Sequence, residues 1–333
     1  MKNTFLVITS IADDRHPILN HYAIESKNYY VPFIVIGDTK SPSVFSLEGA
    51  IFYSIKEQEA LNFKLVKLLP YKHYARKNLG YLLAISKGAT VILETDDDNL
   101  PLDGFWHQRS RHILAHPLCD SGWVNVYRFF TNLNIWPRGF ALEMLSAKLP
   151  LLNDLSLVDC PIQQGLADDN PDVDAIYRLT MQLPFSFDQH TPVALGSGSI
   201  CPFNSQNTTW FKDAFPLLYL PYYCSFRMTD IWRSFVAQRI AWTCGWSILF
   251  HSSSVRQERN EHNLMLDFKD EIPGYLNNLL ISTELNNLML ESGIDNIPIN
   301  MKLCYQKLIE IGCVGPDEID LLSAWLDDLA ALH

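Results

Sequence analysis

The sequence is short of basic residues. Its 333 residues include 26 Lys and Arg against 37 Asp and Glu, which gives a formal net charge of −11. Nucleic-acid binding depends on cationic side chains that release counterions from phosphates, and anionic membrane surfaces attract the same side chains. We therefore expect neither of these partners. A small anionic ligand is compatible with this composition if a metal ion or a local basic cluster offsets the negative field.

Long uncharged hydrophobic runs and paired cysteines are also missing. The most apolar later stretch, residues 231–250, has Arg233 and Arg239 in its middle, which argues against a simple membrane span. The apolar N-terminal segment is short and runs into Asp13 and Asp14, so we interpret it as a first β-strand rather than a signal peptide. None of the seven cysteines belongs to a CxxC pair, which disfavours zinc and favours reduced thiols. We expect a soluble, cytoplasmic protein.

Apolar strand-like runs alternate with helix-like segments over the first hundred residues. The pattern predicts strands at 5–11, 31–37, 50–55 and 90–94, and helices at 18–26 and 71–87. Short, nearly all-apolar strands separated by helices are typical of parallel sheets that are covered on both faces. Because such crossovers are right-handed, the pattern predicts a doubly wound, mostly parallel α/β sheet.

The later part of the chain has a looser pattern. Prolines and short apolar runs over residues 118–209 predict a less regular, partly antiparallel sheet in the same domain. Residues 230–246 predict a helix, and Ser247–Phe250 predicts one more strand. The rest has helical spacing. We therefore expect one α/β domain over residues 1–265 and a C-terminal helical appendage over residues 266–333.

The most informative segment follows the fourth predicted strand. Asp96, Asp97 and Asp98 stand side by side where this strand ends, and ligands of open α/β sheets bind at the carboxyl ends of strands. Adjacent carboxylates repel one another unless solvent or a cation neutralises them. Asp96 and Asp98 point to one side of an extended chain, so we expect them to hold Mg²⁺ or Mn²⁺, which also bridge diphosphate oxygens. The alternative is an exposed acidic turn.

Four other residues are candidates for contacts with a nucleotide. Arg76, Lys77 and Asn78 lie in the helix that leads into this strand, where they would counter phosphate charge or reach the nucleotide. A solvated basic helix start is the alternative. Asp38 follows the second strand at the same sheet edge, where it would accept hydrogen bonds from a base or a ribose, or begin the turn before Ser41.

Several longer sequence words together resemble one protein family. They are Tyr74–Ile85 (YARKNLGYLLAI), Glu94–Asn99 (ETDDDN), Pro171–Thr180 (PDVDAIYRLT), Pro202–Thr208 (PFNSQNT), Asp230–Arg233 (DIWR), Ala237–Arg239 (AQR) and Gln257–Asn263 (QERNEHN). Over roughly residues 1–270 the chain is similar to the STELLO-type glycosyltransferases. That family is related to the reversibly glycosylated polypeptides, or UDP-arabinopyranose mutases.

The resemblance implies a fold, a reaction and a cofactor. The fold is the GT-A nucleotide-diphospho-sugar transferase fold, in which the Asp-x-Asp pair of Asp96 and Asp98 would hold Mn²⁺ or Mg²⁺ and Asp97 would lie beside the nucleotide. The reaction is transfer of a sugar from a nucleotide sugar, expected to be a UDP-sugar, to an unknown acceptor. Two alternatives stay open: a UDP-sugar mutase or self-glycosylating protein, and a non-catalytic binding or regulatory protein. The sequence is also compatible with a homo-oligomer.

Further side chains are candidates for this chemistry. Asp230 is a candidate general base for the acceptor hydroxyl, or a residue that favours a helix start through its negative charge. Asp174 would orient the acceptor, or its loop would be locked by a salt bridge to Arg178. His251 is a candidate further metal ligand, or a hydrogen-bonded surface residue. Arg259 would close over the diphosphate, or it is an ordinary surface residue.

Overall fold

The computed structural model describes residues 3–258 and 263–332. Its strands are β1 (Thr4–Thr9), β2 (Phe33–Ile36), β3 (Ala50–Tyr53), β4 (Val91–Thr95), β5 (Asn99–Pro101), β6 (His112–Leu118), β7 (Gly122–Trp123), β8 (Ser156–Asp159), β9 (Ile162–Asp168), β10 (Val193–Leu195), β11 (Ser199–Ile200), β12 (Asn207–Phe211) and β13 (Ile248–Gln257). Its α-helices are α1 (Pro17–Asn28), α2 (Ile55–Glu59), α3 (Lys77–Ser86), α4 (Ala175–Thr180), α5 (Thr229–Thr243), α6 (Leu264–Asn287), α7 (Ile297–Glu310) and α8 (Glu318–Ala331).

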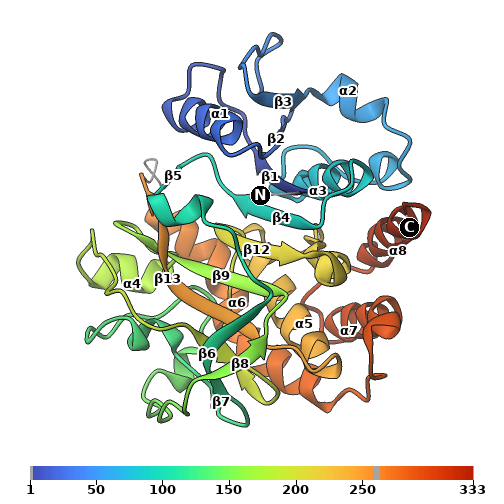
Figure 1. Cartoon of the computed structure of the whole chain (residues 1–333). Coiled ribbons are helices and arrows are strands. Elements are labelled where there is room, and N and C mark those ends of the chain that lie inside the picture. The colour runs from blue at the N-terminus through green and yellow to red at the C-terminus, as the bar shows by residue number, and fades with distance from the viewer. Residues whose placement is uncertain (1–2, 259–262, 333) are drawn as a thin grey trace.

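One large mixed sheet organises the molecule. Within the described residues it has eleven strands in the order β3-β2-β1-β4-β12-β9-β13-β10-β6-β8, with β5 paired to β13. Figure 1 shows this sheet running from β3 at the top of the view to β8 at the bottom, with helices alongside it. The predicted α/β class is confirmed.

The N-terminal part of the sheet is parallel, as the alternating pattern predicts. β1 pairs in parallel with both β2 and β4, and β2 pairs in parallel with β3. Helix α1 covers one face, where Leu19 belongs to the same apolar cluster as Leu6 and Phe33. Helix α3 covers the other face, where Leu79 clusters with Val7. Successive strand residues therefore enter different cores, which explains why these strands are apolar almost throughout.

Helix α3 lies very close to the sheet because it contains a glycine. A Cβ atom on Gly80 would come within 2.5 Å of Val7 Cγ1 and 2.9 Å of Ile36 Cγ1. Such distances are too short for carbon atoms, so a larger residue would push the helix away from β1 and β2. This close packing sets the position of Lys77, which lies in the first turn of the same helix.

The second part of the sheet is partly antiparallel, as predicted. β12 pairs antiparallel with both β4 and β9, whereas β13 pairs in parallel with β9 and antiparallel with β10. The predicted late strand Ser247–Phe250 is longer than expected, since β13 runs from Ile248 to Gln257. Its register shifts between His251 and Val255, and its far end pairs with β5. The sequence pattern did not predict this extension, because the side chains of the intervening serines favour turns rather than strands.

The C-terminal helices share the main hydrophobic core. Leu285 on α6, Met301 on α7 and Trp325 on α8 are buried in the same cluster as Ile92 on β4. The proposed boundary between residues 265 and 266 falls in the first turn of α6. The division into a domain and an appendage stays a prediction. In the described part of the chain, no helix combines the length and the apolar character that a membrane crossing requires.

Candidate functional site

A cleft of about 540 Å³ lies at the carboxyl ends of the parallel strands. Its lining includes residues that directly follow three strands: Ser10 after β1, Asp38 after β2, and Asp96–Asp98 after β4. β1 lies between β2 and β4, and the chain goes out to β2 and β3 before it returns to β4 on the other side. The strand order therefore reverses between β1 and β4. Open α/β sheets bind ligands at this kind of reversal, and the acidic triplet lies there.

The three carboxylates of the triplet have three different partners. Asp96 Oδ1 lies 2.7 Å from the ammonium group of Lys77, whose side chain is fully buried. Asp97 accepts a hydrogen bond from the hydroxyl of Ser10. Asp98 Oδ2 accepts from Gln257 Nε2 at 2.9 Å, whereas Asp98 Oδ1 is buried and has no hydrogen-bond partner among the described residues.

The triplet attracts positive charge. Burial raises the pKa of Asp98 to about 7, with further increases from the negative charges of Asp96 and Asp97. Burial also raises the pKa of Asp96, although Lys77 opposes this shift. Carboxylates with raised pKa values release protons when a cation neutralises them. Burial, with a smaller contribution from the neighbouring carboxylates, thus outweighs the opposing charge of Lys77.

The side chains at the acidic triplet suit a divalent cation whose other coordination positions are filled by a bound ligand and water. In the described part of the chain, no three His, Cys, Asp or Glu side chains are grouped as a full protein cage. Mg²⁺ is usually held by one or two carboxylates together with substrate phosphates and water, and Mn²⁺ also favours oxygen ligands. The unpartnered Oδ1 of Asp98 and the second oxygen of Asp96 match this requirement.

Of the other predicted nucleotide contacts, Asp38 and Arg76 line the cleft, whereas Asn78 and the fully buried Lys77 do not. Asp38 lines it and accepts hydrogen bonds from the backbone N–H groups of Thr39 and His73. Arg76 also lines it, but its guanidinium donates to Gln58 Oε1 and to nearby carbonyl groups. Asn78 is buried elsewhere, with both ends of its amide bound to the backbone of Leu220.

An ion-paired cluster around Arg138 also lines the cleft. The buried guanidinium of Arg138 donates to both oxygens of Asp172, at 2.8 and 2.9 Å, and to both oxygens of Asp230, at 3.1 to 3.2 Å. Asp230 also accepts from the N–H and hydroxyl groups of Ser205. Burial tends to raise the pKa of Asp230, but Arg138 outweighs it and holds this pKa well below its ordinary value. Asp230 is therefore a weak proton acceptor in this arrangement.

Asp174 has a local structural role. It is the N-cap of α4, where Oδ1 accepts from the N–H of Tyr177 at 2.8 Å and Oδ2 accepts from Trp136 Nε1 at 2.6 Å. Burial raises its pKa to about 6. Asp174 is not among the residues that line the cleft. The structure thus brings Asp172 into the cleft and not its neighbour Asp174.

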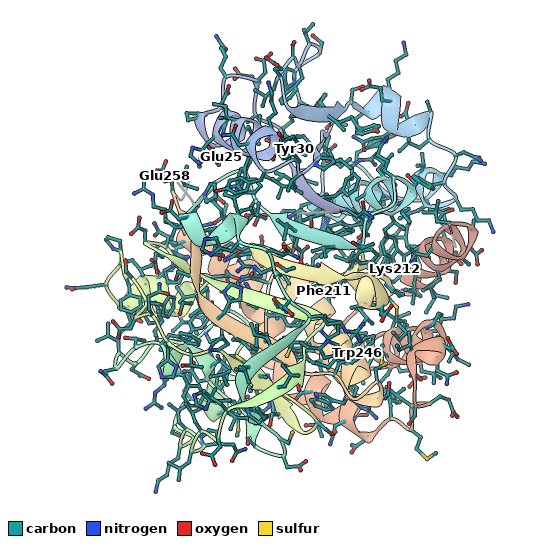
Figure 2. All side chains as sticks on the ribbon, in the orientation of Figure 1. Glu25, Tyr30, Phe211, Lys212, Trp246 and Glu258 are labelled. Carbon is teal, nitrogen blue, oxygen red and sulfur yellow. The ribbon has the colours of Figure 1, made fainter. Side chains whose placement is uncertain are left out.

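His251 is not placed with the acidic triplet. His251 pairs with Gly165 in the β9–β13 ladder, and its Nδ1 lies 2.9 Å from the carbonyl oxygen of Ser252. It precedes Gln257, the contact of Asp98, by six positions, which is up to about 20 Å along an extended strand. Arg259 lies outside the described residues. Figure 2 labels Glu258, whose N–H donates to the carbonyl oxygen of Asp98.

Comparison with known proteins gives the chain a family context. Residues 227–333 match the family model described as STELLO glycosyltransferases. A relative from Arabidopsis thaliana named probable glycosyltransferase STELLO2 is 33% identical over 259 residues, which cover 71% of this chain and 34% of the relative. The chain is related to the STELLO glycosyltransferases. The predicted resemblance is confirmed.

A second STELLO relative extends the similarity. Probable glycosyltransferase STELLO1, also from Arabidopsis thaliana, is 29% identical over 324 residues, which cover 90% of this chain and 41% of that protein. The chain therefore spans about a third to two fifths of the length of these STELLO relatives. The matched STELLO family model begins at residue 227, after the acidic triplet. The metal assignment thus depends on the geometry of the cleft.

Several cleft residues were not predicted from the sequence, and Arg138 is the most important. Nothing in its immediate sequence marks it, because its two carboxylate partners come from distant segments. The following residue explains its position: Gly139 has a φ of +86°, and a Cβ there would lie 2.3 Å from Ile231 Cγ2. The Arg138 segment therefore lies directly against α5, which carries Asp230.

Proposed function

We propose that this chain is a metal-dependent glycosyltransferase of the GT-A type, which transfers a sugar from a UDP-sugar to an acceptor hydroxyl. The observation that carries the proposal is the acidic triplet at the reversal of strand order, where Asp98 keeps a buried, unpartnered carboxylate oxygen. The STELLO relatives, which are named as probable glycosyltransferases, support the reaction class. The cleft volume of about 540 Å³ is within the usual range for ligand sites.

The charges of the cleft support a ligand that arrives with a dication. Among the described residues, six Asp and six Lys or Arg side chains line the cleft, so the formal charges of these lining residues balance. A nucleotide diphosphate sugar brings two negative charges, which a divalent cation would compensate. Asp96 and Asp98 would hold this cation, which would neutralise the charge that develops on the departing diphosphate.

The remaining side chains would bind and orient the donor. Asp38 has lone pairs left after its two backbone contacts and would accept a hydrogen bond from the base. Lys77 would hold Asp96 in place through the ion pair at 2.7 Å. Arg138 would keep Asp172 and Asp230 fixed beside the sugar.

A calorimetric titration tests this proposal. Wild-type protein is titrated with UDP, GDP and ADP, with and without Mn²⁺, and compared with Asp98→Asn and with Asp103→Asn, an exposed acidic residue outside the cleft lining. We expect UDP to bind in the presence of Mn²⁺, with about tenfold or greater weakening in Asp98→Asn and no change in Asp103→Asn. If no nucleotide binds wild-type protein under any metal condition, the proposal is wrong.

A second candidate function is nucleotide-sugar binding without transfer. One observation favours it: Arg138 holds both Asp172 and Asp230, the carboxylates that would otherwise be available to an acceptor. The two functions differ in one measurement. A transferase releases UDP from a UDP-sugar when an acceptor or water is present, whereas a binding protein retains the UDP-sugar intact over the same time.

A further inference from the structure

Phe226 presents an exposed aromatic ring to a cleft that is otherwise rich in charged side chains. Its side chain lines the cleft, although 47% of the residue surface is exposed. Burial of such a ring against a ligand is favourable because it removes a large apolar surface from water. An exposed phenylalanine in a polar cleft therefore indicates a ligand that has an apolar face.

Two neighbouring rings support Phe226 from behind. The ring centroids of His73 and Tyr74 each lie 4.9 Å from that of Phe226, with edge-on angles of 71° and 78°. The hydroxyl of Tyr74 donates to the carbonyl oxygen of Phe226 at 3.2 Å. Edge-to-face packing of this kind is the favourable arrangement for aromatic pairs, and it leaves a face of Phe226 for a ligand.

The backbone on both sides of Phe226 is anchored to α6. The hydroxyl of Ser225 donates to the carbonyl oxygen of Asp270, and the guanidinium of Arg227 lies 2.8 Å from Glu271 Oε1. The ring is therefore held in place before a ligand arrives. Pre-organisation of this kind reduces the entropy that is lost on binding.

Phe226 lies close to the Arg138 cluster. The Tyr74 hydroxyl that contacts Phe226 also lies 3.2 Å from Asp230 Oδ1, so Phe226 adjoins the Arg138 cluster. Another exposed apolar side chain of the cleft, Ile11, follows β1 and is 52% exposed. His73, whose ring packs on Phe226, donates its backbone N–H to Asp38, so Phe226 lies between the Arg138 cluster and the strand ends.

We infer that Phe226 is the stacking platform for a carbohydrate acceptor, an inference that rests on the proposed function. A pyranose ring has an apolar C–H face that suits an aromatic ring and a rim of hydroxyls that suits polar groups. The wall around Phe226 supplies both, because the hydroxyl of Ser205 and the carboxylate of Asp172 also line the cleft. The acceptor of this site is accordingly a glycan.

Oligosaccharide binding tests the inference. Linear tetrasaccharides of β-1,4-linked glucose, xylose, mannose and galactose are titrated into the protein with UDP and Mn²⁺ present, by calorimetry and saturation-transfer NMR. At least one of them is expected to bind wild-type protein. Phe226→Ala is expected to weaken that binding about tenfold or more, whereas Phe226→Trp keeps the aromatic face and stays within about threefold of wild type.

The controls separate this inference from the proposed function. Tyr30→Ala removes an aromatic ring that is 87% exposed, outside the cleft lining and labelled in Figure 2, and should change no titration. UDP binding should also be unchanged in Phe226→Ala. A loss of UDP affinity in that variant would assign the ring to the donor and overturn the inference, as would the failure of every tetrasaccharide to bind. Phe226-dependent tetrasaccharide binding without UDP binding would reject the proposed function alone.

Discussion

The ammonium group of Lys77 lies 2.7 Å from Asp96 Oδ1 and donates at 3.0 Å to the carbonyl oxygen of Thr95. This pair joins the first turn of α3 to the carboxyl end of β4, and the Lys77 side chain has no exposed surface. The pair therefore fixes the first carboxylate of the triplet and offsets part of its charge. Both effects depend on the close approach of α3 to the sheet.

Replacement of Lys77 by methionine should change stability and metal affinity in opposite directions. Asp96 would lose its buried partner, and removal of one partner of a buried pair costs about 3 kcal/mol. The same loss makes the triplet more negative, so Mn²⁺ alone should bind more tightly. Urea denaturation and a Mn²⁺ titration measure the two effects. Lys77→Arg is the charge-preserving control, and weaker Mn²⁺ binding in Lys77→Met would contradict this account.

The part of the cleft at the carboxyl ends of the parallel strands was predicted from the sequence, because local patterns are enough to locate these strands. Apolar runs identified the parallel strands, and parallel strands bring their carboxyl ends to one edge. The positions of Asp38 and Asp96–Asp98 at this edge could therefore be predicted, and all of these residues line the cleft. Lys77 was predicted to counter phosphate charge, but its side chain is fully buried, pairs with Asp96 and is not among the residues that line the cleft.

Asp230 was predicted as a site residue and lines the cleft, but the ion pairs of Arg138 could not be predicted, because they join distant segments. Arg138 and Asp230 are separated by 92 positions, and no local pattern connects them. The amide of Asn78 binds the backbone of Leu220 across 142 positions, which no helix pattern could reveal. Asp174 is a different case: an Asp directly before a helical segment is a common N-cap, so its local role was predictable.

The Arg138 pair predicts a structural effect for Asp230→Asn. This variant leaves Arg138 with one carboxylate partner in place of two, so we expect a loss of about 3 kcal/mol in unfolding free energy. Because the pKa of Asp230 lies well below its ordinary value, the pH profile of turnover should not shift in the variant above pH 5. Chemical denaturation and a pH–rate series measure these quantities.

Asp174→Asn is the matched control for this experiment. Asn is as good an N-cap as Asp, but its NH2 group would face Trp136 Nε1–H, which donates to Asp174 Oδ2, so a loss of about 1 to 3 kcal/mol with no change in turnover is expected. If Asp230→Asn abolishes turnover and leaves stability unchanged, Asp230 is the general base after all, and the ion pair must open during the reaction.

His251 should make the stability of the protein depend on pH below neutrality. Burial lowers the pKa of His251 from 6.5 to about 3, with a further contribution from Arg109. The folded state therefore binds fewer protons than the unfolded state between these values. Stability from this group is complete above pH 6.5 and is lost as the pH falls toward 3, by about 1 kcal/mol per unit.

His251→Gln cannot take up this proton and should flatten the pH dependence, as urea denaturation between pH 5 and pH 7 would measure. The same variant also tests the predicted metal role. Because His251 pairs with Gly165 rather than with the triplet, Mn²⁺ affinity should be unchanged. A drop of about tenfold in Mn²⁺ affinity would make His251 a ligand.

The last helix of the chain, α8, is expected to support the cleft rather than to stand apart from it. Glu318 is fully buried and accepts hydrogen bonds from the hydroxyl of Tyr219 and from the N–H groups of Tyr222 and Tyr223. Asp328 on the same helix accepts from the N–H group of Leu65 at 2.9 Å. Helix α8 thus links two segments that lead to the cleft residues His73, Tyr74 and Phe226.

Glu318→Ala would leave one buried and two partly buried donors without an acceptor, which should cost about 3 kcal/mol. Urea denaturation measures this loss, and amide hydrogen exchange should show faster opening at Tyr222 and Tyr223. Glu318→Gln keeps an acceptor oxygen and should lose less. A C-terminal appendage that folds independently would behave differently: Glu318→Ala would then lower the stability of the last helices alone and leave the exchange of β4 and β12 unchanged.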